Sequence, residues 1–398
     1  MIKGKKASVM QNCLFQKKGA ATFIILVICT VTACTGFYLH KSIPAVENTL
    51  RFVSVIHRHG ERSPLHSYPF DPYKGESYWP EGLRALLQKG KVNMYKLGKF
   101  LRLRYDSLLS TTYKPAEIFV STFCTDRVIM SGQLVLAGLY PPVGIQIWKT
   151  DLLWQPIPIH SMPDSCDDMF HVTKRCKLLS DETKQRDLVI KKKLEDHQEF
   201  LAYLSKYTGL DVKNASHLSG LFDNLSVVEQ QGLTLPQWTR DVYPKKLESL
   251  ANLEFMELFK TQTMIKLESG VLINEIVSNM VRKTDASKNF ERVLNLYPAS
   301  DRILIRLWRG LNMTQEITSK PYYGAALFIE LHEIDKKYRV KILHKKGTTD
   351  DELTTLKIRG CEGGYDLEQD EMCDLDVFLS ALEPMIITDF DKACENST

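Results

Sequence analysis

The sequence has no internal repeat and no low-complexity tract, which excludes a repeat solenoid and a chain that is disordered along most of its length. Its 21 glycines and 16 prolines are too few for a collagen-like fibre. Only one long apolar run occurs, so a membrane protein with several spans is excluded as well. The 398 residues are enough for one large elaborated domain or for two domains.

Acidic side chains are absent from residues 1–41, which hold six lysines. Removing these six from the 52 basic side chains of the chain leaves 46, against 48 acidic ones. The formal net charge of +4 therefore comes from the N-terminal segment, and the remainder of the chain is close to neutral. A body without excess positive charge does not imply a nucleic-acid partner.

Residues 19–39 are apolar or small, with Lys17 and Lys18 before them and Lys41 after them. As a helix, this run is about 30 Å long, which is enough to cross a bilayer. It predicts either an uncleaved transmembrane signal-anchor, with residues 1–18 in the cytoplasm, or a cleaved signal peptide. We favour the anchor, because the run is longer than the apolar core of most signal peptides. Both interpretations deliver the rest of the chain to the secretory pathway, as a secreted, lysosomal or membrane-anchored protein.

The sequence has no CxxC motif and no cluster of cysteine and histidine, so no metal site is predicted. Six cysteines follow the apolar run, and in the secretory lumen they are expected to be structural disulfides. Spacing alone leaves fifteen full pairings open. The six cysteines are Cys124, Cys166, Cys176, Cys361, Cys373 and Cys394. Four sequons for N-glycosylation agree with this compartment. Their acceptors are Asn214, Asn224, Asn312 and Asn396.

Runs of β-branched residues alternate with helical periodicity along most of the chain, which predicts an α/β fold with a mostly parallel sheet flanked by helices. The expected strands cover residues 51–56, 117–121, 302–307, 325–331 and 338–343. A helix is expected over 80–105. Residues 165–268 are rich in lysine and glutamate and helical in period, which predicts an inserted all-helical cap on a domain formed by 50–164 and 269–398.

The loop over residues 57–64 directly follows the first expected strand and carries Arg58, His59 and Arg62. Two guanidinium groups beside one imidazole suit a tetrahedral oxyanion such as phosphate. His59 is then a candidate nucleophile that attacks phosphorus and forms a phosphohistidine. The two cations disfavour protonation of the imidazole and keep it neutral at acidic pH. The alternative is a solvated basic loop, which its position at the end of a buried strand disfavours.

The segment IHRHGERSP resembles the RHGxRxP signature of the histidine acid phosphatases, a branch of the histidine phosphatase superfamily that includes prostatic, lysosomal and insect venom-type enzymes. The resemblance extends from residue 51 to about residue 394, with similar segments at 126–131, 235–238, 267–276 and 325–333. It implies hydrolysis of small-molecule or peptide phosphomonoesters (EC 3.1.3.2), with no metal and no organic cofactor. Members of the family often form homodimers, which makes a homodimer possible here by analogy alone, and the sequence does not decide the oligomeric state.

Roles follow from the same resemblance. Arg58 and Arg62 match the phosphate-binding arginines, His59 matches the nucleophile, and Asp301 matches the proton donor to the leaving alcohol. Cysteine pairing is also implied. Cys361 is expected to pair with Cys373, and Cys166 with Cys394, which leaves Cys176 without a clear partner.

Two positions depart from the family pattern. Ser300 stands where the family has a phosphate-binding histidine, and Ser121 stands where many members have a phosphate-binding arginine. Arg127 remains, at a position that is structural in the family, and Arg302 is a candidate to restore some charge. Losing one preorganised donor costs on the order of 10² to 10³ in rate.

We therefore expect an acid phosphatase of reduced activity. The first alternative is a catalytically silent relative that binds an anionic ligand. A phosphoryl mutase of the same superfamily is disfavoured, because the usual phosphosugar substrates are cytosolic.

Overall fold

The computed structural model describes residues 48–170, 172, 176–257, 260–317, 319–361 and 371–395. The expected cytoplasmic segment 1–18, the apolar run 19–39 and the sequon at Asn396 lie outside the described residues. Within the described ranges, no helix is long and apolar enough to cross a membrane.

A single eight-stranded sheet runs through the protein in the order β3-β2-β4-β1-β5-β6-β7, with β8 paired to β6. One half is parallel and consists of β1 (Leu50–Arg58), β2 (Ile118–Phe123), β3 (His160–Met162) and β4 (Leu294–Ala299). The other half is antiparallel and consists of β5 (Ala326–Ile334), β6 (Lys337–Gly347), β7 (Asp350–Leu356) and β8 (Cys373–Asp374). The predicted α/β fold is confirmed, and the sheet is mixed rather than mostly parallel because β5–β7 are joined by hairpins instead of helical crossovers.

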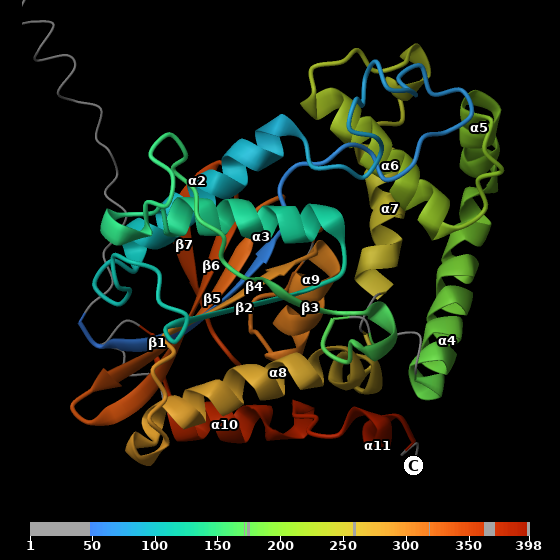
Figure 1. Ribbon diagram of the computed structural model, residues 1–398. Coiled ribbons are helices and arrows are strands. Elements are labelled where there is room, and N and C mark those ends of the chain that lie inside the picture. Colours follow the sequence, from blue (N-terminus) through green and yellow to red (C-terminus); the bar gives the residue numbers. More distant parts are fainter. Residues whose placement is uncertain are drawn as a thin grey trace, which may run out of the picture. The chain divides into compact units, whose positions relative to one another are not determined.

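Helices cover both faces of this sheet (Figure 1). The helices α2 (Gln88–Arg104) and α3 (Asp126–Leu139) lie on one face, where Phe100 packs on Phe328 with ring centroids 6.1 Å apart. Leu327 and Ile329 point the other way and join the core beneath α8 (Gln262–Thr284), α9 (Asp301–Gly310) and α10 (Leu375–Leu382). This alternation is the period of two that a strand buried on both faces requires.

The insertion between β3 and α8 is helical, as the sequence predicted. It contains α4 (Lys177–Leu194), α5 (Gln198–Thr208), α6 (Ala215–Gln230) and α7 (Lys245–Glu257). Leu204, Leu218 and Leu247 belong to a core cluster of its own. Its helices and the sheet belong to one compact unit, so the division into a sheet domain and a cap at residues 165–268 stays a prediction.

Shorter helical elements complete the fold. They are α11 (Phe390–Glu395) and the 3-10 turns Gly144–Gln146, Asp164–Cys166, Glu195–His197, Gln237–Thr239, Ala286–Lys288 and Glu383–Met385. The strand predicted at 302–307 is wrong, since these residues lie in α9. A short apolar run such as ILIRLW fits a buried helix as well as a strand, and periodicity alone does not separate the two. The helix predicted from residue 80 begins at Gln88.

Two disulfides occur among the described residues. Cys361 pairs with Cys373, as predicted. Cys394 pairs with Cys176, at a Cα–Cα distance of 5.4 Å, so the predicted pairing of Cys394 with Cys166 is wrong. Cys176 lies in a buried cluster with Ile387 of the C-terminal segment, whereas Cys166 is exposed. The resemblance selected the wrong one of two cysteines that lie ten residues apart in the same connection.

The sequons differ in their surroundings. Asn214 and Asn312 are exposed. Asn224 is 1% exposed, and its side-chain nitrogen donates hydrogen bonds to the carbonyl oxygen of His66 and to Asp71 Oδ2. The predicted glycan at Asn224 is therefore incompatible with this fold, because a conjugated side-chain nitrogen loses one of its two hydrogens.

We expect peptide mapping of the unreduced protein by mass spectrometry to recover one peptide pair that joins Cys176 to Cys394 and one that joins Cys361 to Cys373. Cys166 should be alkylated by iodoacetamide without prior reduction, because it is exposed and free. A cross-linked peptide joining Cys166 to Cys394 would contradict the structure and restore the pairing that the resemblance implied.

Candidate active site

The carboxyl ends of β1 and β4 lie side by side, because the two strands are parallel and Arg58 is in register with Ala299. The backbone N–H of His59 donates to the carbonyl oxygen of Ala299 over 3.0 Å, which continues the pairing by one residue past β1. The loop after β1 therefore meets the first turn of α9, which begins at Asp301. The edge where parallel strands end is where open α/β sheets bind their ligands.

The site loop is packed against α2 at a backbone-to-backbone contact. A Cβ atom on Gly90 would lie 2.2 Å from the carbonyl oxygen of Glu61, and one on Gly60 would lie 2.7 Å from the carbonyl oxygen of Gly90. Only glycine permits such an approach. The N–H of Gly60 also donates to Ser131 Oγ over 3.2 Å, which ties the loop to α3. The backbone that carries His59 is thus fixed from two sides.

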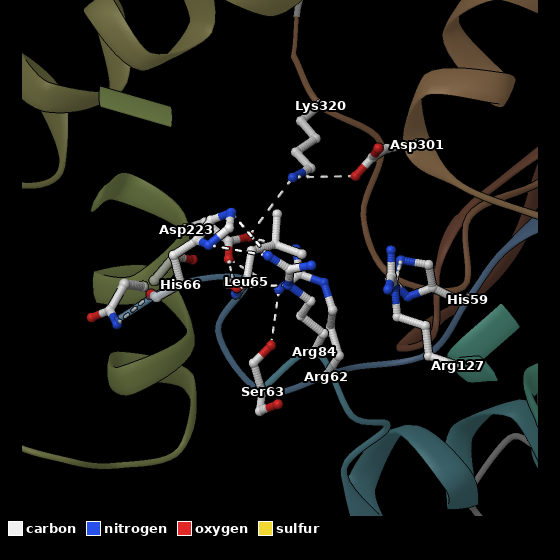
Figure 2. A network of polar contacts seen from close by, with 12 residues as sticks. His59, Arg62, Ser63, Leu65, His66, Arg84, Arg127, Asp223, Asp301 and Lys320 are labelled. Carbon is white, nitrogen blue, oxygen red and sulfur yellow. Dashed lines mark hydrogen bonds and ion pairs between the residues drawn. The ribbon is translucent and has the colours of Figure 1, made fainter. Parts of the chain in front are cut away.

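His59 is 2% exposed, and both of its ring nitrogens have partners. Nδ1 lies 2.8 Å from the carbonyl oxygen of Gly60, which can only accept, so Nδ1 carries the hydrogen. Nε2 accepts from Arg127 Nε at 3.3 Å, and the two side chains lie close together in Figure 2. Burial, with the charges of Arg58, Arg62 and Arg127, holds the pKa of His59 well below its usual value, and the bond to Gly60 opposes this only in part. The ring is therefore a neutral base with its lone pair at Nε2.

Arg58 joins the two site segments. Its Nη2 lies 2.9 Å from Asp301 Oδ2, and its Nη1 donates to the carbonyl oxygen of Pro321 over 2.5 Å. The guanidinium carbon lies 4.0 Å from the centre of the Tyr323 ring. Such stacking and forked bonding orient the plane of the guanidinium group.

Arg62 makes a two-pronged ion pair with Asp223 of α6, in which Nη1 lies 3.0 Å from Oδ2 and Nη2 lies 2.7 Å from Oδ1. Its guanidinium group also donates to the carbonyl oxygen of Ser63. Both partners are buried. The helical insertion thus supplies the carboxylate that orients one of the two predicted phosphate-binding arginines.

Asp301 stands in the first turn of α9 and is 8% exposed. Its Oδ1 accepts from the backbone N–H of Arg302 at 2.8 Å, and its Oδ2 faces both Arg58 and Lys320. Burial by itself would raise the pKa of this carboxyl. The charges of Lys320, Arg58 and Arg62 outweigh burial and hold the pKa well below its usual range. In the empty site Asp301 is therefore a carboxylate.

Four residues that the structure places around His59 and Asp301 were not predicted as site residues from the sequence. Arg127 was interpreted as structural, but its side chain donates to His59. Burial, followed by the charges of Arg62 and Arg58, lowers the pKa of Arg127 to about 10, although Asp301 raises it. Asp223, Lys320 and Tyr323 lie in no motif that the resemblance singled out. We call these residues, together with Arg58, His59, Arg62 and Asp301, the site cluster.

The two departures from the family pattern lie in different surroundings. Ser300 precedes α9 and lines the cavity beside Asp301, whereas Ser121 is buried on β2 and is not among the residues that line this cavity. Arg302 also lines the cavity, but its side chain is 51% exposed and faces Glu254 at 3.8 Å. The ion pair turns Arg302 towards α7, so it does not replace the missing charge at His59.

The site cluster borders two cavities. Arg58, Asp223, Lys320 and Tyr323 line one of ≈ 610 Å³. The other is lined by His59, Arg62, Arg127, Asp301 and again Lys320, and has a volume of ≈ 640 Å³. His59, Arg127 and Asp301 form its wall on the sheet side, and Ser216 and Phe255 of the insertion form the opposite wall. Within the ranges that the structure describes, no group of three histidine, cysteine or acidic side chains is placed to hold a metal ion. The positive charge available to a ligand here comes from arginine and lysine.

The site thus combines a neutral histidine held among cations, at the carboxyl edge of an α/β sheet, with a carboxyl group one strand away. Comparison with known sequences identifies the family. The family model for the histidine phosphatase superfamily (branch 2) matches residues 49–345, and the chain belongs to this family, as its motifs predicted.

Curated relatives agree with this assignment. The chain is 32% identical to human prostatic acid phosphatase over 366 residues, which is 90% of each chain. It is 31% identical to lysosomal acid phosphatase of Xenopus laevis over 90% of this chain and 82% of that one. Among solved structures, the fold is similar to Hafnia alvei phytase in complex with myo-inositol hexakis sulphate, with a TM-score of 0.63 at 17% identity, over 88% of this chain and 99% of that one.

We expect His59 to stay uncharged between pH 7 and pH 5, because its pKa is depressed by burial and by three arginines. The check is an NMR titration of the protein labelled with ¹³C at histidine Cε1, in which the His59 signal is assigned by its absence from His59→Ala. That signal should keep the position of a neutral ring, while free imidazole in the same sample titrates. A midpoint near the ordinary value of about 6.5 would contradict the geometry described above.

Proposed function

We propose that the protein is an acid phosphatase that hydrolyses phosphomonoesters through a phosphohistidine intermediate on His59. The observation that supports this most directly is the state of the ring. The Nδ1–H group of His59 donates to the carbonyl oxygen of Gly60, so the lone pair of the neutral ring is at Nε2. The positive charge of Arg127 lies beside Nε2 and attracts an anion to that side of the ring. Membership in a family whose named relatives are acid phosphatases is consistent with the proposal.

In the first step of the proposed reaction, Nε2 forms a bond to phosphorus and the bond from phosphorus to the ester oxygen breaks. The leaving oxygen takes a proton from Asp301. In the second step, water attacks phosphorus, its proton returns to Asp301, and the P–N bond breaks to release inorganic phosphate. Arg58, Arg62 and Arg127 balance the charge on the non-bridging oxygens.

The proposal accounts for an acidic working range. Asp301 must be protonated to donate, yet in the empty site its pKa is held well below its usual range. A bound phosphate adds negative charge and competes for Arg58, so it raises the pKa of this carboxyl. His59 must be neutral, and its own depressed pKa keeps it so when the solution is acidic. Activity is therefore expected on the acidic side and lost as the pH rises and Asp301 loses its proton.

Reduced activity is part of the proposal, because neither Ser121 nor Ser300 carries a charge. The same two residues support the second candidate function, a silent relative that binds a phosphorylated or other anionic ligand without turnover. Arg127 favours the enzyme, since its guanidinium group already reaches His59. Two disulfides and relatives named as lysosomal and prostatic acid phosphatases are typical of the secretory pathway.

Membrane anchoring and a homodimer complete the proposal. N-terminal sequencing of the mature protein decides between the anchor and a cleaved signal, and sedimentation velocity of the purified protein decides the oligomeric state.

We expect the purified protein to hydrolyse p-nitrophenyl phosphate at pH 5 at least about 10²-fold faster than His59→Ala, because removal of a nucleophile leaves only binding and electrostatic effects. His160→Ala is the matched control, since His160 is exposed on β3 and does not line the cavity. Rapid quench without acid should trap phosphate on His59. Equal rates for the protein and His59→Ala would leave the silent binding protein as the better account.

We expect Ser300→His to raise kcat by about tenfold or more, because it restores a donor beside Asp301 at a position where one such group is worth on the order of 10² in rate. Ser300→Leu, which adds bulk without a donor, is the control and should not gain. The measurement is kcat for p-nitrophenyl phosphate at pH 5. If Ser300→His shows no gain, the first turn of α9 no longer presents residue 300 to the phosphate as the family pattern implies.

A further inference from the structure

Lys320 enters the site cluster from the segment between α9 and β5, and no sequence motif indicated it. Its Nζ lies 3.2 Å from Asp301 Oδ2 and 3.8 Å from Asp223 Oδ1. Figure 2 shows the side chain reaching across the site, with contacts to both carboxylates. It therefore links the proposed proton donor on α9 to the carboxylate that orients Arg62.

Both carboxylates are already paired without Lys320. Asp301 has Arg58 at 2.9 Å, and Asp223 has Arg62 at 2.7 Å, so the distances from Lys320 are the longer ones. The side chain of Lys320 is also 26% exposed, whereas those of Arg58 and Arg62 are 4% and 2% exposed. Among the cations of the site cluster whose partner is a carboxylate, Lys320 is thus the least fixed and loses least when it turns to another anion.

The charge of the site cluster points to the anion. Its cations are Arg58, Arg62, Arg127 and Lys320, and its carboxylates are Asp223 and Asp301. With His59 and Tyr323 neutral, two positive charges remain uncompensated. A phosphomonoester carries one negative charge below its second pKa of about 6 and two above it, so this surplus is sufficient for either form. Without Lys320, the site cluster would have only one uncompensated positive charge.

We propose that Lys320 is a phosphate-binding residue that pairs with Asp301 while the site is empty and with the phosphoryl group when substrate is bound. The inference rests on the proposed function and adds a residue to it. By leaving Asp301 as substrate arrives, the ammonium group removes one of the charges that stabilise the carboxylate, and the carboxyl group can then take up the proton that it donates. Ser300, which has no charge, supplies neither effect.

The pH dependence follows from the groups that face Asp301. They are Arg58, His59 and Arg62 from β1 and its loop, Arg127 from α3, Lys320 from the connecting segment, the backbone N–H of Arg302 in α9, and Asp223 from α6 through Lys320. Removing one positive charge from this set raises the pKa of Asp301. Lys320 is paired with Asp301 in the free enzyme, and the alkaline limb of kcat/KM reports loss of the Asp301 proton in that state, so this limb moves to higher pH when the charge of Lys320 is removed.

The test compares Lys320→Met, which keeps the length and loses the charge, with Lys320→Arg, which keeps the charge, in the full-length protein. Lys213→Met is the matched control, because Lys213 is an exposed lysine that is also paired with an aspartate and lines neither cavity. The readouts are the dissociation constant of inorganic phosphate by calorimetric titration at pH 5, and the pH profiles of kcat and KM for p-nitrophenyl phosphate.

We expect Lys320→Met to weaken phosphate binding and raise KM about tenfold, and to move the alkaline limb of kcat/KM upwards by at least half a pH unit. Lys320→Arg should restore binding to within about threefold, and Lys213→Met should match the unaltered protein. A purely structural role for Lys320 would lower the amount of active protein without moving the limb. If Lys320→Met does not fold, Lys320→Gln is measured with the same two readouts.

The measurement of phosphate binding distinguishes a failure of this inference from a failure of the proposed function. If the unaltered protein binds phosphate without hydrolysing the ester, and Lys320→Met weakens that binding, the proposed function fails while the role of Lys320 in binding holds. If the unaltered protein hydrolyses the ester and Lys320→Met keeps its phosphate affinity and its pH profile, the enzyme stands and the inference about Lys320 is overturned.

Discussion

The parallel pairing of β1 with β4 is the interaction on which the site depends. It continues through the bond from the N–H of His59 to the carbonyl oxygen of Ala299, and it brings two segments more than 200 residues apart in the sequence to one edge of the sheet. Neither segment carries a complete site. The loop after β1 supplies a base and two cations, and the first turn of α9 supplies a carboxyl group. A shift of one residue in the register would turn the side chains at these positions to opposite faces of the sheet.

The buried positive charge of the site cluster has to be stabilised while no ligand is bound, and the helical insertion supplies one of the stabilising carboxylates. Asp223 lies on α6, and its carboxylate orients Arg62 of the loop after β1 through a direct ion pair. Burying one member of such a pair alone would be strongly destabilising, so insertion and sheet are coupled through it. The insertion therefore contributes to the charge of the site as well as to the cavity wall.

The sequence predicts best what lies contiguous in it. Arg58, His59 and Arg62 fall within five residues, and their common loop places them together whatever the rest of the chain does. Asp301 needed the family pattern, since nothing local marks it. Lys320 and Asp223 escaped prediction because their contacts exist only in three dimensions, and Cys176 because spacing does not fix pairing. The prediction of a strand at 302–307 was wrong for a physical reason too. The apolar residues of this segment would face the core in a strand as well as in a helix, so their pattern does not distinguish the two.

The positive charge that an active site needs can be supplied by a residue at a different position in the sequence. Removal of one preorganised donor costs about 2.7 to 4 kcal/mol of transition-state stabilisation. A unit charge about 4 Å from an anion is worth about 4 kcal/mol at the effective dielectric constant of about 20 found near protein surfaces. One cation from another part of the chain is thus of the size needed to offset one lost donor. Ser121 and Ser300 stand where the family resemblance implies donors, and Lys320, which lies outside the family motifs, reaches Asp301. In the proposed function, the positive charge that holds the phosphate is thus supplied by the fold as a whole, although the family's pattern of residues is not intact.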